Sequence, residues 1–494
     1  MHLQNLDQSP YTTSFNFHKM DYYPIEHVLA VATIHPFYQP TIQFPPDSDQ
    51  IHEAISSSSS GLSSPTARSL TSVPLTHKKD LYQTIQRLGS DRDPRNNYRR
   101  SSYISVTGGG SGGVPMMFAT DGRENRNQRS TAGRLIQACG VIEANDWVLT
   151  VHSSGALYRS LDLVTEMLEN AGASVLCAGH LMSHANLVKL CVAHRVNVVC
   201  GDSSQILQFA LHVAGLPPAT RDALCINKVI YTSEPLVRAQ RRYLTSVLGP
   251  VSICSLFASA ESGPWAVMNL TLTGDVADDA ADFIFDSRAM CVEVLPLSAV
   301  NEDQPQSAIA REIHALPDGE KGAIILTSLQ RLRNPLVRYV TGDVGSLHPL
   351  PAAAIASIPD EIAPRLRILR LQGRDQRFSF KWQGEYFEFH FLEDFFQQRE
   401  DLGVLQWQIL LRDNEYSHAQ ECEVRLLRGR RVAEASPPAF SDSELVQLLK
   451  KVFCVSPLDQ SLFGVTFVVN DTGFERSATG NKVLRFVNRS TVSQ

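Results

Sequence analysis

The sequence predicts an α/β fold: a large N-terminal domain with parallel sheets covered by helices, followed by a small α+β C-terminal domain. Between residues 147 and 257, near-continuous apolar strands alternate four times with amphipathic helices. This alternation is typical of a parallel sheet with helices on both faces. Beyond residue 322, strands follow one another with only one or two helices among them, which indicates a separate α+β unit.

Each element of the alternating region has its own local signal. Leu161, Val164 and Leu168 stand at helical spacing, and Gly172 follows where that helix should end. Pro235 marks the first turn of the last helix. The predicted strands are residues 147–153, 174–179, 196–200, 226–233 and 251–258, and the helices between them are residues 161–168, 184–194, 203–215 and 235–249.

The remaining segments complete the predicted domain organisation. Later strands are predicted at residues 322–329, 337–347, 404–413, 421–428 and 463–471, with a helix at 443–453. Because residues 46–75 are rich in Ser and Pro, we expect a flexible loop there. The predicted units are an N-terminal segment that packs on the main domain (1–45), this loop (46–75), the main domain (76–374) and the C-terminal domain (375–494).

Composition excludes several classes of protein. The net charge of −6 argues against a dedicated nucleic-acid binder, which usually carries a basic excess. The nine cysteines form no CxxC pair and no zinc-type cluster, so we expect reduced thiols and a cytoplasmic protein. The N-terminus has no secretory pattern, and no apolar run reaches the ~18 residues of a membrane span. We therefore expect neither a nucleic acid nor a membrane as partner.

A glycine-rich loop is the first candidate site. Thr107–Pro115 follows a predicted strand and contains five glycines among its nine residues. Glycine lets backbone N–H groups come close to a ligand, and Ser or Thr adds hydroxyl donors, so the loop has the composition of a phosphate cradle. It matches neither the Walker loop nor a clean GxGxxG pattern, and a flexible surface loop is the alternative.

Four charged residues are further candidates. Glu261 directly follows a predicted strand and could hold Mg²⁺, or it could be a solvated loop residue. Asp343, in the run RYVTGD, could accept hydrogen bonds from a ribose diol or serve its own turn. Arg374 lies at the predicted domain junction and suits an anion contact or a simple turn. Lys482, on a Gly-containing loop, could enter a site as a point charge or stay solvated.

The order and spacing of these motifs resemble the AMP-forming adenylate-forming superfamily. Within it, the chain is similar to the phenylacetate–CoA ligase-like branch, over roughly residues 25–490. The branch-level similarities are HPFYQP at 35–40, PLTHKKDL at 74–81, YTSEP at 231–235 and SAESGP at 259–264. The motifs RYVTGD and ASAESGP are the most specific.

The resemblance implies a role for each candidate residue. The β- and γ-phosphates of ATP would lie on the loop residues Thr107, Gly108, Gly109, Gly110, Ser111, Gly112 and Gly113. The adenine would lie against Ser233, Glu234 and Pro235. Glu261 would contact Mg²⁺, Asp343 the ribose, and Arg374 the ribose or phosphate. Lys482 would bridge the carboxylate and the α-phosphate while the acyl-adenylate forms, and residues 375–494 would be a mobile domain that rotates between half-reactions.

The implied activity is ATP-dependent activation of a small carboxylic acid to an acyl-adenylate, followed by transfer to coenzyme A in specialised metabolism. The cofactors would be ATP and Mg²⁺. Because they stand at or near strand ends, we expect the acyl pocket at His152, Ser153, Phe257, Ala258, Ser259 and Ala260, with an aromatic or medium-chain acid as substrate. The alternatives are an amide- or ester-forming synthetase and a non-catalytic nucleotide-binding homologue.

Two departures from the family pattern bear on these alternatives. Val114 stands where the family loop has lysine, which removes a cation from the phosphate site. Gln376 and Arg377 follow Asp375 where the family has a second aspartate.

Overall fold

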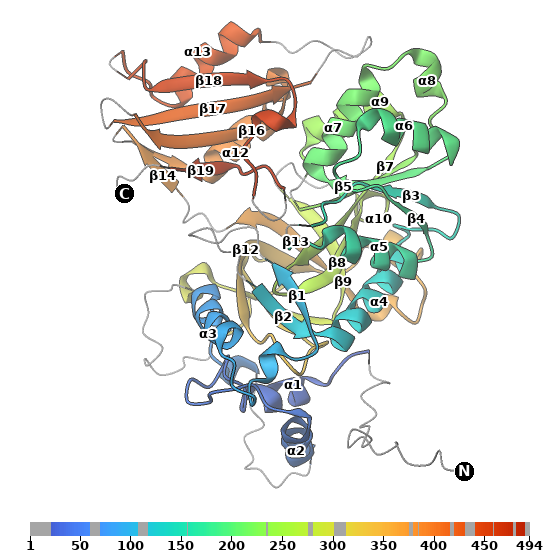
Figure 1. Cartoon of the computed structure of the whole chain (residues 1–494), viewed down its shortest axis with the longest axis vertical. Helices are drawn as coiled ribbons and strands as arrows, with labels where there is room; N and C mark the ends of the chain where they lie inside the picture. Colours follow the sequence, from blue (N-terminus) through green and yellow to red (C-terminus); the bar gives the residue numbers. More distant parts are fainter. Residues whose placement is uncertain are drawn as a thin grey trace, which may run out of the picture.

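The computed structural model describes residues 21–59, 70–106, 117–155, 157–233, 236–274, 280–300, 313–374, 379–383, 385–414, 419–429, 440–457, 459–477 and 481–489. Figure 1 shows a large body built around one long sheet, with the N-terminal helices at one end and the C-terminal strands beside helices α7 and α9 at the other. Among these residues, no helix is long and apolar enough to cross a membrane.

The central sheet has eleven strands in the order β10-β11-β12-β13-β9-β8-β7-β6-β5-β3-β4. The five strands from β7 to β4 are parallel to one another, and the remaining pairs are antiparallel. Their bounds are β3 Trp147–Thr150, β4 Ser174–Cys177, β5 Val198–Asp202, β6 Lys228–Thr232, β7 Ser252–Ser259, β8 Gly263–Asn269, β9 Ala281–Asp286, β10 Met290–Leu295, β11 Gly322–Ser328, β12 Tyr339–His348 and β13 Leu366–Arg374. The predicted parallel part is confirmed, and antiparallel strands extend it.

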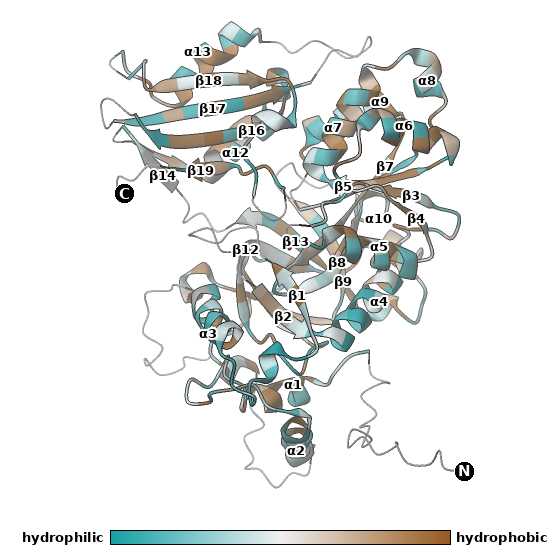
Figure 2. Ribbon diagram, in the orientation of Figure 1, coloured by the Kyte–Doolittle hydropathy of each residue, from teal (hydrophilic) through white to brown (hydrophobic). Residues whose placement is uncertain are grey.

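Helices cover both faces of this sheet, as predicted. Neighbouring residues of one strand enter different buried clusters: Val148 packs with helices α4 and α5, whereas Leu149 packs with α6, α7 and α9. In Figure 2 the parallel strands are largely brown, while α3 and α4 show teal residues toward solvent. The helices of the main body are α4 Gly122–Ala138, α5 Ser160–Asn170, α6 His184–Ala193, α7 Ser203–Ala214, α8 Pro218–Asp222, α9 Arg238–Leu248, α10 Leu270–Thr273 and α11 Ala352–Ile355.

The N-terminal region packs on the main body, and it contains a helix that the sequence analysis missed. Its elements are α1 Ile25–Ala32, α2 Ser48–Ser59, α3 Lys78–Ser90 and the antiparallel strands β1 Ser102–Val106 and β2 Met117–Asp121. Helix α2 lies inside the segment expected to be a loop, so that expectation was wrong for these residues. Asp47 and Gln50 cap each other's backbone N–H groups at 2.9 Å, and Ile51 and Ile55 pack toward α1.

The C-terminal residues form a separate α+β layer, as predicted. A four-stranded sheet in the order β18-β17-β16-β19 packs with two helices and the hairpin β14-β15 around its own apolar core. The elements are β14 Ser379–Trp382, β15 Glu385–Glu388, α12 Phe389–Gln398, β16 Val404–Asp413, β17 Gln420–Arg428, α13 Asp442–Val452, β18 Phe463–Val468 and β19 Phe486–Asn488. Short 3₁₀ turns are η2 Leu70–Ser72, η3 Asn97–Arg99, η4 Leu297–Val300, η5 Ala363–Arg365, η6 Glu400–Leu402 and η7 Asp471–Gly473.

The C-terminal layer contacts the main body through helices α7 and α9. Leu211 of α7 joins Leu405, Phe474 and Val483 in one buried apolar cluster. Gln240 of α9 donates a hydrogen bond to the carbonyl of Leu405. The predicted domain junction at Asp375, Gln376 and Arg377 lies outside the described residues.

Candidate functional site

The parallel strands β3, β5, β6 and β7 end at one edge of the central sheet, which we call the carboxyl edge. Ligands of open α/β sheets bind at this kind of edge. His152, Ser233 and Glu261 follow the ends of β3, β6 and β7. The topology therefore brings together three residues that the sequence analysis singled out.

His152 is a buried link between two strand ends. Its Nδ1 lies 2.9 Å from the Thr150 hydroxyl and its Nε2 lies 2.9 Å from the Thr232 hydroxyl, and the residue is only 2% exposed. Burial, together with the positive charge of Lys482, lowers the pKa of His152 to about 3. The imidazole is therefore neutral. Ser153 is also buried, and its hydroxyl accepts a hydrogen bond from Gln205 at 3.4 Å. Neither His152 nor Ser153 therefore contributes much to the accessible surface of the expected acyl pocket.

Lys482 reaches the carboxyl edge from the C-terminal layer. It lines a small cavity of about 10 Å³ together with Ser233 and the start of α7. Its Nζ lies 5.9 Å from the centre of the Tyr158 ring. Ser477 holds the lysine backbone through two hydrogen bonds, of 2.8 and 3.1 Å. Lys482 and Ser233, predicted from segments about 250 residues apart along the chain, are thus brought together.

Ser233 has a left-handed backbone, with a φ of +80°, which is uncommon for a residue with a side chain. Such conformations cluster at functional sites, where the surrounding structure holds them. Glu234 and Pro235, the other predicted adenine contacts, lie outside the described residues.

Glu261 is a buried carboxylate paired with a lysine. It is 5% exposed, its Oε1 accepts a 2.7 Å hydrogen bond from the Tyr82 hydroxyl, and the same oxygen lies 3.3 Å from Lys78 Nζ. Burial alone would raise the pKa of Glu261, but Lys78 and the Tyr82 hydroxyl hold it below its usual value. Glu261 therefore stays ionised at neutral pH.

Arg331 lies behind Glu261 and was not predicted. Its guanidinium is buried, donates to the Glu261 carbonyl, and lies 3.3 Å from Gln128 Oε1 on α4. Burial lowers the pKa of Arg331 to about 10, so it keeps its charge at neutral pH. Lys78 and Tyr82 were also missed as site residues, although Lys78 lies within PLTHKKDL and Tyr82 directly follows it. The run LQRLRNPLV contains two arginines, Arg331 and Arg333, beside other polar residues, and nothing in it distinguishes Arg331 as the buried one.

The glycine-rich loop itself, Thr107 to Pro115, lies outside the described residues, but its two flanking strands are described. Val106 and Met117 pair at the end of the β1-β2 hairpin. The Ser105 hydroxyl donates to the Ala260 carbonyl at 2.9 Å. The loop therefore begins two residues from a contact with the segment that carries Glu261.

Asp343 and Arg374 are opposite each other in the β12-β13 ladder. Just before Asp343, Gly342 has a φ of +79°, which its lack of a side chain permits. The Asp343 backbone N–H donates to the Thr341 hydroxyl at 2.9 Å. Arg338, which begins the RYVTGD run, has a structural partner instead, because its guanidinium pairs with buried Glu293 at 3.0 Å.

The second half of the expected acyl pocket lies at the end of β7. The Phe257 ring packs against Trp265 and Phe283, with ring centres 5.5 and 5.0 Å apart. Ala258 and Ser259 are exposed, and Ala260 is half-buried. These small residues, rather than His152 and Ser153, form the accessible surface there.

The carboxylate of Glu261 could supply one ligand of a Mg²⁺ site. Mg²⁺ in phosphate-transferring sites is typically held by one or two carboxylates and by the substrate phosphates. Among the described residues, no group of three or more His, Cys, Asp or Glu could enclose a metal ion. Glu261 could therefore hold Mg²⁺ only together with phosphate oxygens, and at a position where Lys78 already supplies positive charge.

The comparisons with known proteins concern the fold. No protein-family model matches the chain, and no curated protein matches it in sequence. A solved structure of 2-hydroxyisobutyryl-CoA ligase in the postadenylation state, in complex with an acyl-AMP, is similar, with a TM-score of 0.60, 16% identity, and coverage of 94% of this chain and 88% of that chain. The same ligase in the thioesterification state, with CoA, gives a TM-score of 0.52 at 16% identity and coverage of 94% and 87%. The predicted fold class, with its C-terminal domain, is thereby confirmed.

Proposed function

We propose that the protein is an AMP-forming acid–thiol ligase, which activates a carboxylic acid with ATP and transfers the acyl group to coenzyme A. The observation that carries this proposal is the position of Lys482, a C-terminal residue that lines one cavity with Ser233 at the carboxyl edge. The likeness in fold to a CoA ligase supports it. So does the position of Glu261 beside the hairpin that carries the glycine-rich loop.

The proposed reaction has two steps. An oxygen of the acid attacks the α-phosphorus of ATP, and the bond to pyrophosphate breaks. The thiol sulfur of CoA then loses its proton and attacks the acyl carbonyl, and AMP leaves. The first step joins two anionic groups, so the site has to place positive charge where negative charge develops. Lys482 and the backbone N–H groups of the glycine-rich loop would do this, and Mg²⁺ on Glu261 would neutralise phosphate charge when bound.

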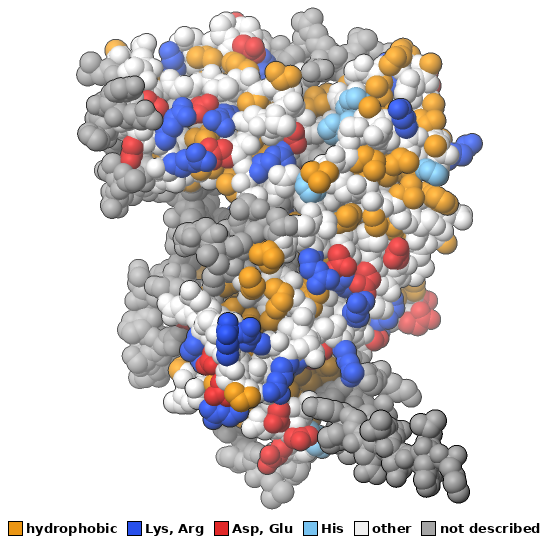
Figure 3. Space-filling model, in the orientation of Figure 1, with side chains coloured by type: hydrophobic (Ala, Val, Ile, Leu, Met, Phe, Trp, Pro, Cys, Tyr) orange, Lys and Arg blue, Asp and Glu red, His pale blue; other side chains and the backbone are white. Residues whose placement is uncertain are grey.

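Two features support binding of an anionic nucleotide in an acidic protein. Figure 3 shows several Lys and Arg side chains over the face around α3 and α4, with Asp and Glu side chains among those near α4. Lys78 adds a cation 3.3 Å from Glu261. In this proposal Lys78 replaces the positive charge that Val114 removes from the loop.

The domain arrangement supports the first step in particular. The TM-score is 0.60 to the postadenylation state of the similar ligase and 0.52 to its thioesterification state. Lys482 lies at the carboxyl edge in the present arrangement. We infer that the C-terminal domain is placed for adenylation here and turns away for thioester formation.

The finer assignment, to the phenylacetate–CoA ligase-like branch and to specialised metabolism, is part of the proposal. One of its marks contacts the segment just before RYVTGD: in HPFYQP, His35 Nε2 lies 3.4 Å from Asn334 Oδ1, and the Tyr38 hydroxyl donates to the Pro335 carbonyl at 2.8 Å. HPFYQP thus supports the segment that leads into RYVTGD.

One experiment tests the proposal directly. The folded protein is incubated with ATP, Mg²⁺ and a panel of aryl and alkyl acids, and pyrophosphate release is measured. CoA, amines and alcohols are then offered in turn, and the product masses are recorded. We expect pyrophosphate release with an aromatic or medium-chain acid and a CoA thioester as the product. An amide or ester product would assign the alternative synthetase.

A non-catalytic nucleotide-binding role is the second candidate. The observation that favours it is the pairing of Glu261 with Lys78 and Tyr82, which already satisfies the carboxylate oxygen Oε1. Binding of ATP by calorimetry, with no pyrophosphate release across the whole acid panel, would establish this candidate and contradict the first.

A further inference from the structure

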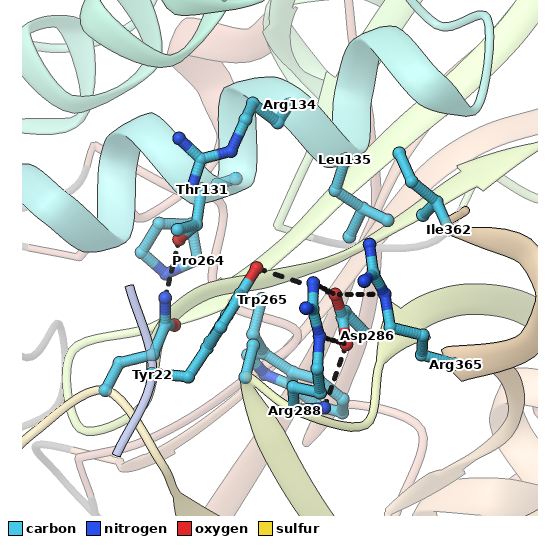
Figure 4. A pocket seen from close by; sticks show the side chains of 13 residues that line it. Tyr22, Thr131, Arg134, Leu135, Pro264, Trp265, Asp286, Arg288, Ile362 and Arg365 are labelled. Atoms are coloured by element: carbon cyan, nitrogen blue, oxygen red, sulfur yellow. Dashed lines mark hydrogen bonds and ion pairs between the residues drawn. The ribbon is translucent and has the colours of Figure 1, made fainter. Parts of the chain in front are cut away.

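A cavity of about 110 Å³ lies between helix α4 and strands β8 and β9. None of its lining residues was predicted as a site residue, although Trp265 packs against Phe257 of the expected acyl pocket. Figure 4 shows that its side chains come from separate parts of the chain, with Tyr22 from the N-terminal segment on one side and Ile362 and Arg365 on the other. We call it the arginine cavity.

The charges around this cavity do not balance. Arg134, Arg288 and Arg365 line it, with Asp286 as the carboxylate among the lining residues. Arg288 Nη2 lies 2.9 Å from Asp286 Oδ2, and Arg134 pairs at 2.7 Å with Asp21 outside the lining. Three guanidinium groups thus share two carboxylates, which leaves one positive charge in excess.

Two of the lining residues carry a buried donor that has no hydrogen-bond partner among the residues that the structure describes. Nε of Arg365 is buried and lies 3.7 Å from Asp286 Oδ2, which is too far for a hydrogen bond. The indole Nε1 of Trp265 is also buried without a partner, and the residue is 2% exposed. Buried donors are rarely left without an acceptor, so two such donors on residues that line one cavity favour a ligand that accepts hydrogen bonds. Because both groups only donate, the missing ligand has to accept.

Part of the remaining wall of the arginine cavity is apolar and is formed by Leu135 of α4, Pro264 of β8, Ile362 and Trp265. The polar side chains of Thr131 and Gln330 also line the cavity and are hydrogen-bonded to each other. Inorganic phosphate would place charged oxygens against the apolar part of this wall, and burying charge in apolar surroundings costs free energy. A ligand with one anionic end and a short hydrocarbon end matches both halves of the lining.

We propose that the arginine cavity binds a short-chain carboxylate anion such as propionate. Its five heavy atoms fit within the 110 Å³ of the cavity, because a water-sized group needs only about 10–15 Å³ of such volume. The carboxylate oxygens accept from Arg365 and the Trp265 indole, and the alkyl end packs on Leu135 and Ile362. Arg365 contributes a planar guanidinium, which suits two-point contact with a carboxylate. This site is independent of the proposed ligase reaction.

The test uses the full chain without ATP and titrates it with sodium propionate in a calorimeter. Propionamide, which has the same shape without the charge, and inorganic phosphate are titrated in parallel. We expect one propionate per chain, weaker binding of phosphate and no binding of propionamide. Phosphate binding as tight as propionate, or no propionate binding at all, would overturn the proposal.

Three variants assign the binding to this cavity. Arg365→Gln removes the charged donor and should weaken propionate binding about tenfold or more, whereas Trp265→Phe keeps the ring and should weaken it by about fivefold. Arg367→Gln is the matched control, because Arg367 pairs with Asp318 and does not line the cavity. Lys482→Ala separates the two sites: if it abolishes propionate binding while Arg365→Gln and Trp265→Phe leave it intact, the anion is in the candidate active site and the proposal fails.

Discussion

Glu124, on helix α4, gives the most quantitative test of the structure. Its Oε1 accepts from the backbone N–H of Leu332 at 2.8 Å and from the Tyr23 hydroxyl at 3.4 Å, while its Oε2 is buried and has no partner in the described part of the chain. Burial, with some help from the charge of Asp121, raises the pKa of Glu124 from 4.5 to about 7. The neutral acid is therefore the form that the folded protein prefers.

This shift predicts the sign and size of a pH dependence. In the unfolded chain the carboxyl group ionises near pH 4.5, whereas in the folded chain it stays protonated until about pH 7. Its contribution to stability is therefore fully present below pH 4.5 and is lost as the pH rises through 7. A shift of roughly 2.5 pKa units corresponds to about 3 kcal/mol of unfolding free energy.

The variant Glu124→Gln keeps the accepting oxygen and removes the titration. We expect wild-type protein to lose about 3 kcal/mol more stability than the variant between pH 4.5 and pH 8. Urea unfolding of both proteins, followed by tryptophan fluorescence at several pH values, measures this difference. Glu169→Gln, at an exposed position of α5, is the control for a change of charge. Parallel pH profiles for wild type and Glu124→Gln would refute the reasoning.

Three further predictions concern the candidate site and its support. Lys482→Ala should slow acyl-adenylate formation by about 10²–10³-fold, because it removes one preorganised charge from the transition state. Pyrophosphate exchange measures this step, and thioester formation from supplied acyl-adenylate should stay near wild type; equal losses in both steps would contradict the role. Lys78→Met removes the cation that lowers the pKa of Glu261. The acid limb of the pH–rate profile should therefore move to higher pH, and an unmoved limb would show that Glu261 is not titrating there. Arg338→Met leaves Glu293 buried without its partner. It should destabilise the protein by about 3–5 kcal/mol in urea unfolding, and a loss below 1 kcal/mol would show that Glu293 finds another partner.

The sequence predicts those helices and strands whose pattern of apolar residues can be recognised within the element itself. In β6, Val229 and Ile230 face opposite sides of the sheet, and both are fully buried, so the strand is apolar throughout and easy to detect. Helix α2 was missed because its cap and its two isoleucines stand beside a run of serines that dominates the composition. Strands β8 and β9 are buried throughout and carry apolar runs of their own, but the sequence analysis did not predict them. Their antiparallel direction follows from pairing of β8 with its neighbour β7 and of β9 with the distant strand β13.

In the candidate site, too, some residues have local sequence signals and others are placed only by tertiary packing. Ser233 and Glu261 follow strands and could be placed at the sheet edge from sequence alone. The partners of Glu261 could not, because Tyr82 is 179 residues away along the chain and Arg331 comes from a loop after β11. Tertiary packing decides which charged residue neutralises a buried carboxylate. The spacing of residues along the sequence does not predict that partner.

The anchoring of Lys482 has a consequence for any movement of the C-terminal domain. The next residue, Val483, is buried in the same apolar cluster as Leu211 and Phe474. Withdrawing the lysine from the carboxyl edge therefore pulls Val483 out as well and exposes apolar surface to water. Apolar contacts weaken on cooling. If the C-terminal domain turns as proposed above, cooling would therefore favour its release from helix α7 and warming would favour its attachment.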